Sequence, residues 1–202
     1  MGASPKKKSP AGTIIFLCLF AAVVVGGFLM LTRNKDKGTA EIPAESSETD
    51  ILIKKDLIFD YPATPREVLK LYCRITMCLY NEDLTDTQRK KLVGQLRGLY
   101  SSELLAINPE DEQISLLKGD REEYKKANKT IFQYKISKAD DIRYIDSKGG
   151  KTAIVQMVFT TKAGGNLDRV FEEFSLIRDD NDHWKIMGWQ KMENELNIED
   201  EE

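Results

Sequence analysis

The sequence predicts an α+β protein: one transmembrane helix at the N-terminus, then helices packed on a curved four-stranded antiparallel sheet. Three observations predict this fold class. Residues 13–32 form an apolar stretch without a charged residue. Residues 64–128 carry helix-capping signals and apolar residues at helical spacing. From residue 130 onward, apolar-rich runs alternate with joints rich in Gly, Asn and Asp, which is typical of antiparallel strands.

The apolar stretch, TIIFLCLFAAVVVGGFLMLT, is predicted to be an uncleaved transmembrane helix. At the helical rise its length is about 30 Å, which matches the hydrocarbon core of a bilayer. A cleavable signal peptide would need small residues where Phe28 to Leu31 stand. Lys6 occupies the place where a myristoylation motif requires Ser or Thr. We therefore expect residues 1–12 to be a cytoplasmic stub and residues 13–32 to be the anchor.

Charge is distributed unevenly along the chain. Residues 1–37 carry a net charge of +5, whereas the remaining residues sum to −8. Nucleic-acid binding needs a basic face, and no cluster of Lys and Arg with interleaved aromatic residues follows the membrane flanks. We therefore expect the bilayer, and not a nucleic acid, as a partner of this chain.

Residues 33–60 are predicted to be a linker that ends in an extended segment. Residues 34–50 are rich in polar residues and contain Ile42 as their one large apolar side chain, so they cannot offset their ordering entropy by burial. The run from Ile51 to Tyr61 is expected to form a short strand or an extended segment. The α+β domain should then occupy residues 61–192, with an acidic tail at residues 193–202.

Two capping boxes predict the first helices of the domain. Thr64 and Glu67 flank Pro65 at the first helical position, and they predict a helix from Pro65 to about Tyr80. Thr85 with Gln88 predicts the next helix, through Leu99. Two further helices are expected: a short one from Ser101 or Ser102 that ends at Pro109, and one over Glu110–Leu117 with Gly119 beyond it. The polar and charged residues Asp120 to Asn128 are expected to form a last helical turn that leads into the sheet.

Four apolar-rich runs predict the sheet. Residues that accept hairpin turn geometries separate them, including Gly149-Gly150 and Gly164-Gly165. The expected strands are residues 130–144, 151–162, 167–178 and 183–192. Their order along the chain predicts an antiparallel meander covered on one face by the preceding helices.

The candidate site residues are few. Glu172 and Glu173 lie in mid-strand, so alternation places one on each face, and the inward carboxylate could have a raised pKa and act as a general base. Trp184 and Trp189 are five apart, which places them on opposite faces of an ideal strand, one in the core and the other at an interface or pocket rim. His183 has no evident partner for catalysis. Cys73 and Cys78 lie far from His183 in the sequence and do not make a metal-ligand set, and no cofactor motif is present.

The order of elements, closed by the strand His183-Trp184-Lys185-Ile186-Met187-Gly188-Trp189 after an Asp/Asn turn, resembles the cone-shaped fold of the nuclear transport factor two superfamily. The resemblance covers about Tyr61 to Met192. It implies a pocket between sheet and helices, which some members use for catalysis and many use for binding or dimerisation. The catalytic residues of the enzymatic members cannot be matched to positions in this chain.

The whole chain resembles membrane-anchored proteins of Firmicutes that carry such a domain. Basic residues on the two sides of the apolar stretch are balanced, so the count leaves the orientation open. A resemblance to signal-anchored bacterial envelope proteins implies that the N-terminus is cytoplasmic and the domain extracytoplasmic.

We expect a binding or assembly module without catalytic activity, which forms a homo-oligomer or docks on an envelope protein. The plan is similar to that of the inner-membrane ring component of type IV secretion machines, so a secretion or conjugation complex is one version of this role. A ligand-binding protein or enzyme that uses the pocket is the alternative.

Overall fold

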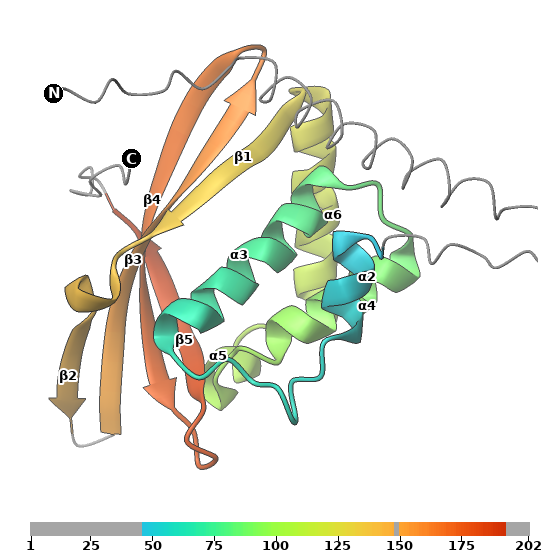
Figure 1. The fold of residues 1–202 in the computed structure, drawn as a ribbon. Helices are drawn as coiled ribbons and strands as arrows, with labels where there is room; N and C mark the ends of the chain where they lie inside the picture. Colours follow the sequence, from blue (N-terminus) through green and yellow to red (C-terminus); the bar gives the residue numbers. More distant parts are fainter. Residues whose placement is uncertain (1–45, 148–149, 193–202) are drawn as a thin grey trace, which may run out of the picture. The chain divides into compact units, whose positions relative to one another are not determined.

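Helices cover one face of a curved antiparallel sheet in this protein (Figure 1). The structure, a computed structural model, describes residues 46–147 and 150–192. The predicted α+β class with helices on a curved antiparallel sheet is confirmed. The predicted stub, transmembrane helix and acidic tail lie outside the described residues. Within the described ranges, no helix is long and apolar enough to cross a membrane.

The capped helices form where the sequence predicts them. Thr64 accepts a hydrogen bond from the Glu67 backbone N–H, and the Glu67 carboxylate accepts one from the Thr64 backbone, so the predicted capping box is present. Thr85 and Gln88 form the second box in the same way. These contacts satisfy N–H groups that would otherwise lack partners at the helix starts. The described helices are α2 (Glu48–Lys54), α3 (Pro65–Asn81), α4 (Asp86–Arg97), α5 (Ser102–Ala106) and α6 (Glu110–Lys126).

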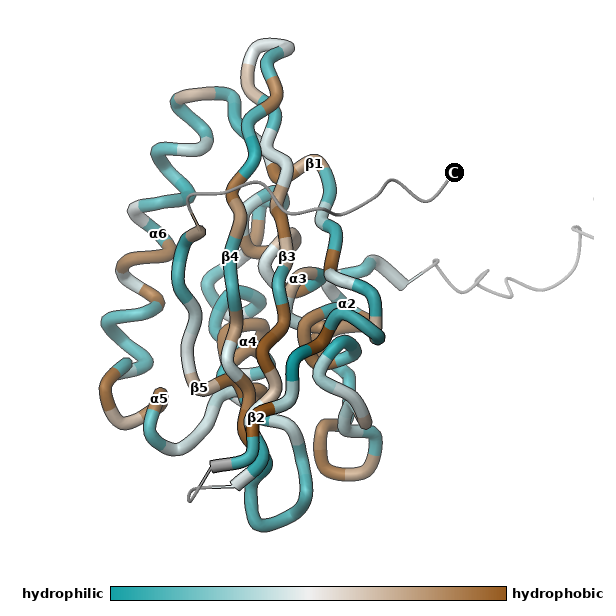
Figure 2. The backbone as a smooth tube through the Cα atoms, turned by 90° about the vertical axis from the view of Figure 1, so that its left-hand side faces the viewer, coloured by the Kyte–Doolittle hydropathy of each residue, from teal (hydrophilic) through white to brown (hydrophobic). Residues whose placement is uncertain are grey.

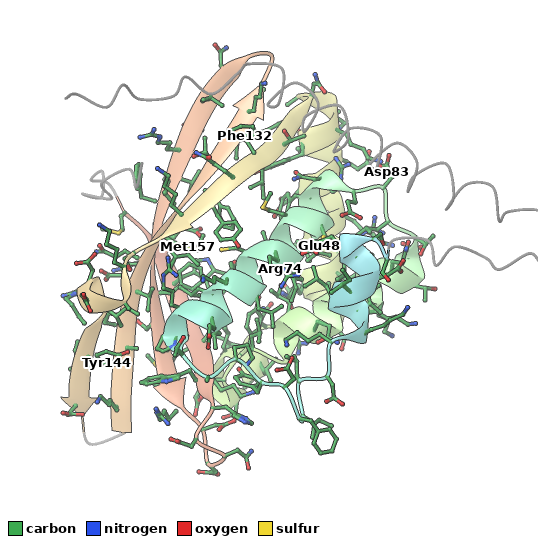
Figure 3. All side chains as sticks on the ribbon, in the orientation of Figure 1. Glu48, Arg74, Asp83, Phe132, Tyr144 and Met157 are labelled. Atoms are coloured by element: carbon green, nitrogen blue, oxygen red, sulfur yellow. The ribbon has the colours of Figure 1, made fainter. Side chains whose placement is uncertain are left out.

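Helix α2 corrects the predicted linker and extended segment where it lies, over Glu48–Lys54, and residues 33–45 of that predicted linker lie outside the described residues. Ser47 caps the helix, and Leu52 is fully buried in the core. The guanidinium of Arg74 on α3 donates two hydrogen bonds to Glu48, at 2.7 and 3.2 Å (Figure 3). The amide of Gln95 on α4 donates to the backbone carbonyls of Ile53 and Lys55. The compact unit therefore includes residues from 46 onward, because the burial of Leu52 together with the contacts of α2 to α3 and α4 offsets the polar composition of the segment.

Helix α6 is one continuous helix, whereas the sequence predicts a helix to Leu117 and a separate last turn after Gly119. It continues through Gly119 to Lys126 instead of ending near Leu117. Arg121 in its second half is buried and donates to the Asn81 carbonyl at 3.3 Å. Arg121 and Lys125 both pair with Asp83, which lies between α3 and α4. These tertiary contacts hold the second half of the helix and offset the low helix propensity of the glycine.

Among the described residues, the sheet has five strands and not the predicted four. The run predicted as one strand over residues 130–144 is broken by a 3₁₀ turn at Ala139–Asp141, and its two halves pair with different parts of the same neighbour. The sheet order is β1-β3-β4-β5, with β2 also paired to β3. A two-residue turn at Gly164 and Gly165, both with positive φ, joins β3 to β4. The strands are β1 (Lys129–Ile136), β2 (Arg143–Ser147), β3 (Gly150–Ala163), β4 (Asn166–Arg178) and β5 (Trp184–Lys191).

The core lies between the sheet and α3. Met157 of β3 points from the sheet toward α3, where its Sδ is 3.7 Å from the Cys73 Sγ (Figure 3). Phe174 of β4 is fully buried and meets Tyr72 of α3 edge to face. Helices cover this inner face of the sheet, whereas no described helix covers the outer face (Figures 1 and 2). The difference between the two faces determines the environments of Glu172 and Glu173, the neighbouring carboxylates in the middle of β4.

Candidate functional site

A cavity of about 310 Å³ lies between the inner face of the sheet and helices α3 and α6. Its volume is at the lower end of the range for small-molecule sites. Most of its lining is apolar or aromatic, and its polar groups are few. The aromatic lining residues are Tyr72, Tyr80, Tyr100, Tyr124, Phe159 and Trp189.

Glu172 lines this cavity from the middle of β4. Its register partners are Met157 on β3 and Lys191 on β5, so it lies on the same face of the sheet as the core. The Oε2 atom is buried, and no described residue donates a hydrogen bond to it. Desolvation by burial raises the pKa of the Glu172 carboxyl to about 7. The cavity therefore contains a buried oxygen that a bound molecule could satisfy.

Glu173 lies on the outer face and does not reach the cavity. Its carboxylate accepts hydrogen bonds from Arg143 at 2.9 Å and from Gln156 at 3.0 Å. The amide of Gln190 on β5 lies 3.4 Å from the other oxygen. The two neighbouring carboxylates therefore differ in their hydrogen bonds. Glu173 accepts hydrogen bonds within a polar network on the sheet, whereas the Oε2 of Glu172 can still accept one from a ligand.

Aromatic rings form two walls of the cavity. Trp189 stacks on Phe174 with ring centroids 5.5 Å apart, and its ring also lies 6.0 Å from that of Tyr72 and 6.1 Å from that of Tyr100. On the other wall, the rings of Tyr80 and Tyr124 lie 4.8 Å apart at an angle of 58°. These rings expose π-faces and a limited number of hydroxyl groups, which suits a ligand with a compact apolar body.

Polar groups gather along the helical side of the cavity. The Tyr80 hydroxyl donates to the exposed Asp120 carboxylate at 3.0 Å. Proximity to Asp120 adds to the desolvation that raises the Tyr80 pKa. The amide of Gln113 donates to the Tyr100 hydroxyl at 3.2 Å, and Arg97 in turn donates to Gln113 at 3.1 Å. This chain of hydrogen bonds fixes the ring of Tyr100 toward the cavity.

The two tryptophans lie on the same face of the sheet, contrary to the prediction of opposite faces, although one is in the core and the other lines the cavity, as expected. The β4–β5 register shifts between Ser175 and Leu176, so that Met187 has no register partner and the alternation of β5 is reset. Trp189, 39% exposed, lines the cavity. Trp184, 3% exposed, lies outside the cavity, where the Arg178 guanidinium covers its ring at 4.7 Å. An ideal strand would separate the two rings; the bulge brings both inward.

The remaining candidates of the sequence lie away from the cavity. His183 stacks on Tyr61 with centroids 4.2 Å apart, and its backbone N–H donates to Asp179. Cys73 and Cys78 are buried and unpaired with one another, and burial raises the pKa of both thiols, that of Cys78 to about 12. In the described part of the chain, no three His, Cys, Asp or Glu residues gather as metal ligands.

Sequence reasoning named Glu172 and Trp189 only together with Glu173 and Trp184, and it missed most of the cavity. The tyrosines of α3 and α6 and the exposed Asp120 come from segments distant in the sequence. A signal was present for α3, because its apolar residues extend around most of the helix and predict contacts on more than one side. No comparable signal marks Tyr124, which lies in a strongly charged segment.

Comparison with protein families finds a match that spans both the predicted anchor and the cavity. Residues 3–189 match the model of a family described as "Domain of unknown function (DUF6715)". No curated protein matches the sequence. The matched range contains the apolar stretch at residues 13–32 and every residue of the cavity lining. Because the match covers most of the chain, the protein belongs to the DUF6715 family.

Proposed function

We propose that this protein is a single-pass, membrane-anchored binding module that takes a small organic molecule into the cavity beside Glu172. The observation that carries the proposal is the buried Oε2 atom of Glu172, which has no hydrogen-bond donor among the described residues. Buried polar atoms in native proteins are nearly always satisfied, and an unsatisfied one is costly. A ligand with a donor group would remove that cost on binding.

The shape and lining of the cavity support the proposal. Its volume of about 310 Å³ accommodates a compact molecule of roughly ten heavy atoms, the lower end of what such sites hold. Aromatic walls would supply most of the contact area, and Glu172 would fix the orientation. An apolar lining that supplies contact area, with a few polar groups that fix the orientation, is typical of ligand sites.

The anchor and the fold family complete the proposal. Residues 13–32 would span the membrane once, and a short tether would hold the domain close to the surface, on the extracytoplasmic side. Helices followed by a curved sheet, with a cavity between them, also support assignment of the domain to the nuclear transport factor two superfamily. Placement near the membrane would suit a module that senses or carries a molecule in the cell envelope.

Binding of fragments to the full-length chain in mild detergent tests the proposal. We expect saturation-transfer NMR to detect aromatic fragments of about ten heavy atoms. Val170→Trp, which fills the cavity, should abolish the signals, whereas Phe171→Trp on the adjacent, outward-facing position should leave them. Equal signals for both variants, or no signal from any fragment, would rule the cavity out as a ligand site.

An enzymatic role is the second candidate, and one observation favours it. A pKa of about 7 suits Glu172 to act as a general base near neutral pH. If the protein is an enzyme, Glu172→Gln should abolish turnover of a bound molecule, and its binding in the cavity should still be measurable. If it is a binding module, the bound molecule should be recovered chemically unchanged from both proteins.

The assembly role expected from the sequence stays a prediction. Such a role, including one in a secretion or conjugation complex, requires contacts between copies of the chain or with an envelope protein. Crosslinking in cells at native expression should then recover species larger than the monomer. Recovery of the monomer alone would count against assembly and leave the ligand-binding proposal intact.

A further inference from the structure

We infer that the cavity selects an organic cation, namely an ammonium or methylated ammonium group attached to a compact apolar body. This inference rests on the proposed function, because it names the chemical class of the ligand for the same cavity. Three features carry it: the signs of the charges that line the cavity, the arrangement of the aromatic rings, and the free acceptor of Glu172.

The charged groups that line the cavity are acidic. Glu172 lies within it and Asp120 lies at its helical side, and no Lys, Arg or His is among the described lining residues. A low-dielectric cavity with carboxylates and no lining cation attracts positive ligands and repels anions. An anionic ligand would have to approach two carboxylates without a compensating charge.

Cations at the edges of the cavity have other contacts. The Lys129 ammonium lies 5.1 Å from the centroid of the Tyr124 ring. Arg97 donates to Gln113 and to the Asn108 carbonyl. Lys191, the register partner of Glu172 on β5, is exposed. None of the three donates a hydrogen bond to the buried Oε2 of Glu172 in the described structure, so this oxygen is available to a ligand.

The aromatic lining suits a cation as well as an apolar group. Electron-rich faces of Tyr and Trp attract ammonium groups, and the attraction grows where water is excluded. The Tyr80–Tyr124 pair and the Tyr72–Trp189 pair approach the cavity from α3, α6 and β5. Tyr124 already holds the Lys129 ammonium near its ring, so this ring is used for a cation within the protein itself. A ligand ammonium between these rings could also donate to the free Oε2 of Glu172.

Proton linkage gives the inference a second consequence. A cation binds the ionised carboxylate, so binding should lower the pKa of Glu172 from about 7 and release a proton. Affinity for a permanently charged cation should therefore rise with pH, and be about tenfold weaker at pH 6 than at pH 8. The titratable and charged groups around Glu172 are Tyr72, Cys73 and Tyr80 of α3, Tyr100, Asp120 and Tyr124 on the helical side, and Lys191 of β5. Lys129 of β1 lies over the ring of Tyr124.

The test compares three probes that share one ring: benzylammonium, benzyl alcohol and benzoate. Calorimetric titration of the full-length chain in mild detergent, corrected with protein-free micelles, should give benzylammonium at least tenfold tighter affinity than the other two. Glu172→Gln should remove this preference, and the matched variant Glu173→Gln should keep it. Asp120→Asn, at an exposed position, should weaken the affinity for benzylammonium two- to threefold without perturbing the core. Benzyltrimethylammonium, whose charge does not titrate, should show the tenfold change between pH 6 and pH 8.

The outcomes separate the inference from the proposed function. Equal or tighter binding of benzyl alcohol or benzoate would overturn the cation inference while the cavity remains a ligand site. A benzylammonium preference that survives Glu172→Gln would overturn it too. If none of the three probes binds, the inference fails, and the fragment experiment with Val170→Trp and Phe171→Trp decides the proposed function by itself.

Discussion

Glu172 and Glu173 are neighbours in the chain, yet the sheet places them in opposite environments. Glu173 accepts hydrogen bonds from Arg143 and Gln156 on the outer face. Glu172 faces aromatic rings, and its Oε2 has no donor in the described structure. The same residue type therefore has an ordinary structural contact at one position and a free, desolvated carboxylate at the next.

The raised pKa of Glu172 predicts that stability decreases as pH rises. An unfolded Glu ionises above pH 4.5, whereas folded Glu172 ionises only near pH 7, so the folded state binds more protons between these values. The free energy of unfolding should fall across this window by up to about 3 kcal/mol. Urea unfolding of the full-length chain in detergent at pH 5 and pH 8 measures the change.

The Glu172→Gln variant provides the control for this prediction. It removes the titrating group, so its stability should vary less between pH 5 and pH 8, and at pH 8 it should exceed wild type by about 2 kcal/mol. The Glu173→Gln variant should retain the dependence that Glu172 causes. If wild type and Glu172→Gln respond equally to pH, Glu172 does not have the raised pKa.

At the scale of elements, helix α2 and the bulge in β5 show how packing overrides local pattern. The polar segment around α2 reads as a tether, but burial of Leu52 and the Glu48–Arg74 pair make it part of the domain. In β5, the bulge at Met187 turns Trp189 toward the cavity, although strict alternation would send it outward. Both elements obtain their stability from contacts with distant residues, which a local pattern does not record.

Replacing Leu52 tests whether α2 belongs to the domain. Leu52→Ala should lower the free energy of unfolding by about 3 kcal/mol, because Leu52 is fully buried and its removal leaves a cavity. The adjacent Ile51, 49% exposed, is the matched control, and Ile51→Ala should cost less than about 1 kcal/mol. Thermal or urea unfolding monitored by circular dichroism measures both. Similar small effects for the two variants would mean that α2 is dispensable.

At the scale of the whole molecule, the predicted anchor implies an orientation of the domain that experiment can test. The predicted anchor lies outside the described residues. Because the basic residues on its two sides are balanced, the expected orientation depends only on the resemblance to signal-anchored envelope proteins. The domain itself supplies a means to decide this. Its two cysteines, Cys73 and Cys78, are buried, and burial raises the pKa of each thiol, so both should react slowly with surface reagents.

A cysteine introduced on the surface should report the orientation. Asp140 is exposed in the 3₁₀ turn between β1 and β2, and Asp140→Cys should leave the fold unchanged. If the domain is extracytoplasmic, a membrane-impermeant maleimide should label this variant in intact cells, and wild type should give little labelling. Labelling of Asp140→Cys only after lysis would place the domain in the cytoplasm and contradict the predicted orientation.

The sequence by itself determined the capped starts of α3 and α4, the class of the fold and the hairpin turn at Gly164-Gly165, because these features depend on residues close together in the chain. It also limited the inward carboxylate to one of two positions. Only the tertiary structure decided that this residue is Glu172, that both tryptophans face inward, and that tyrosines of α3 and α6 surround one cavity. These outcomes depend on strand register, on a bulge and on contacts between distant segments, and packing of the whole domain sets all three.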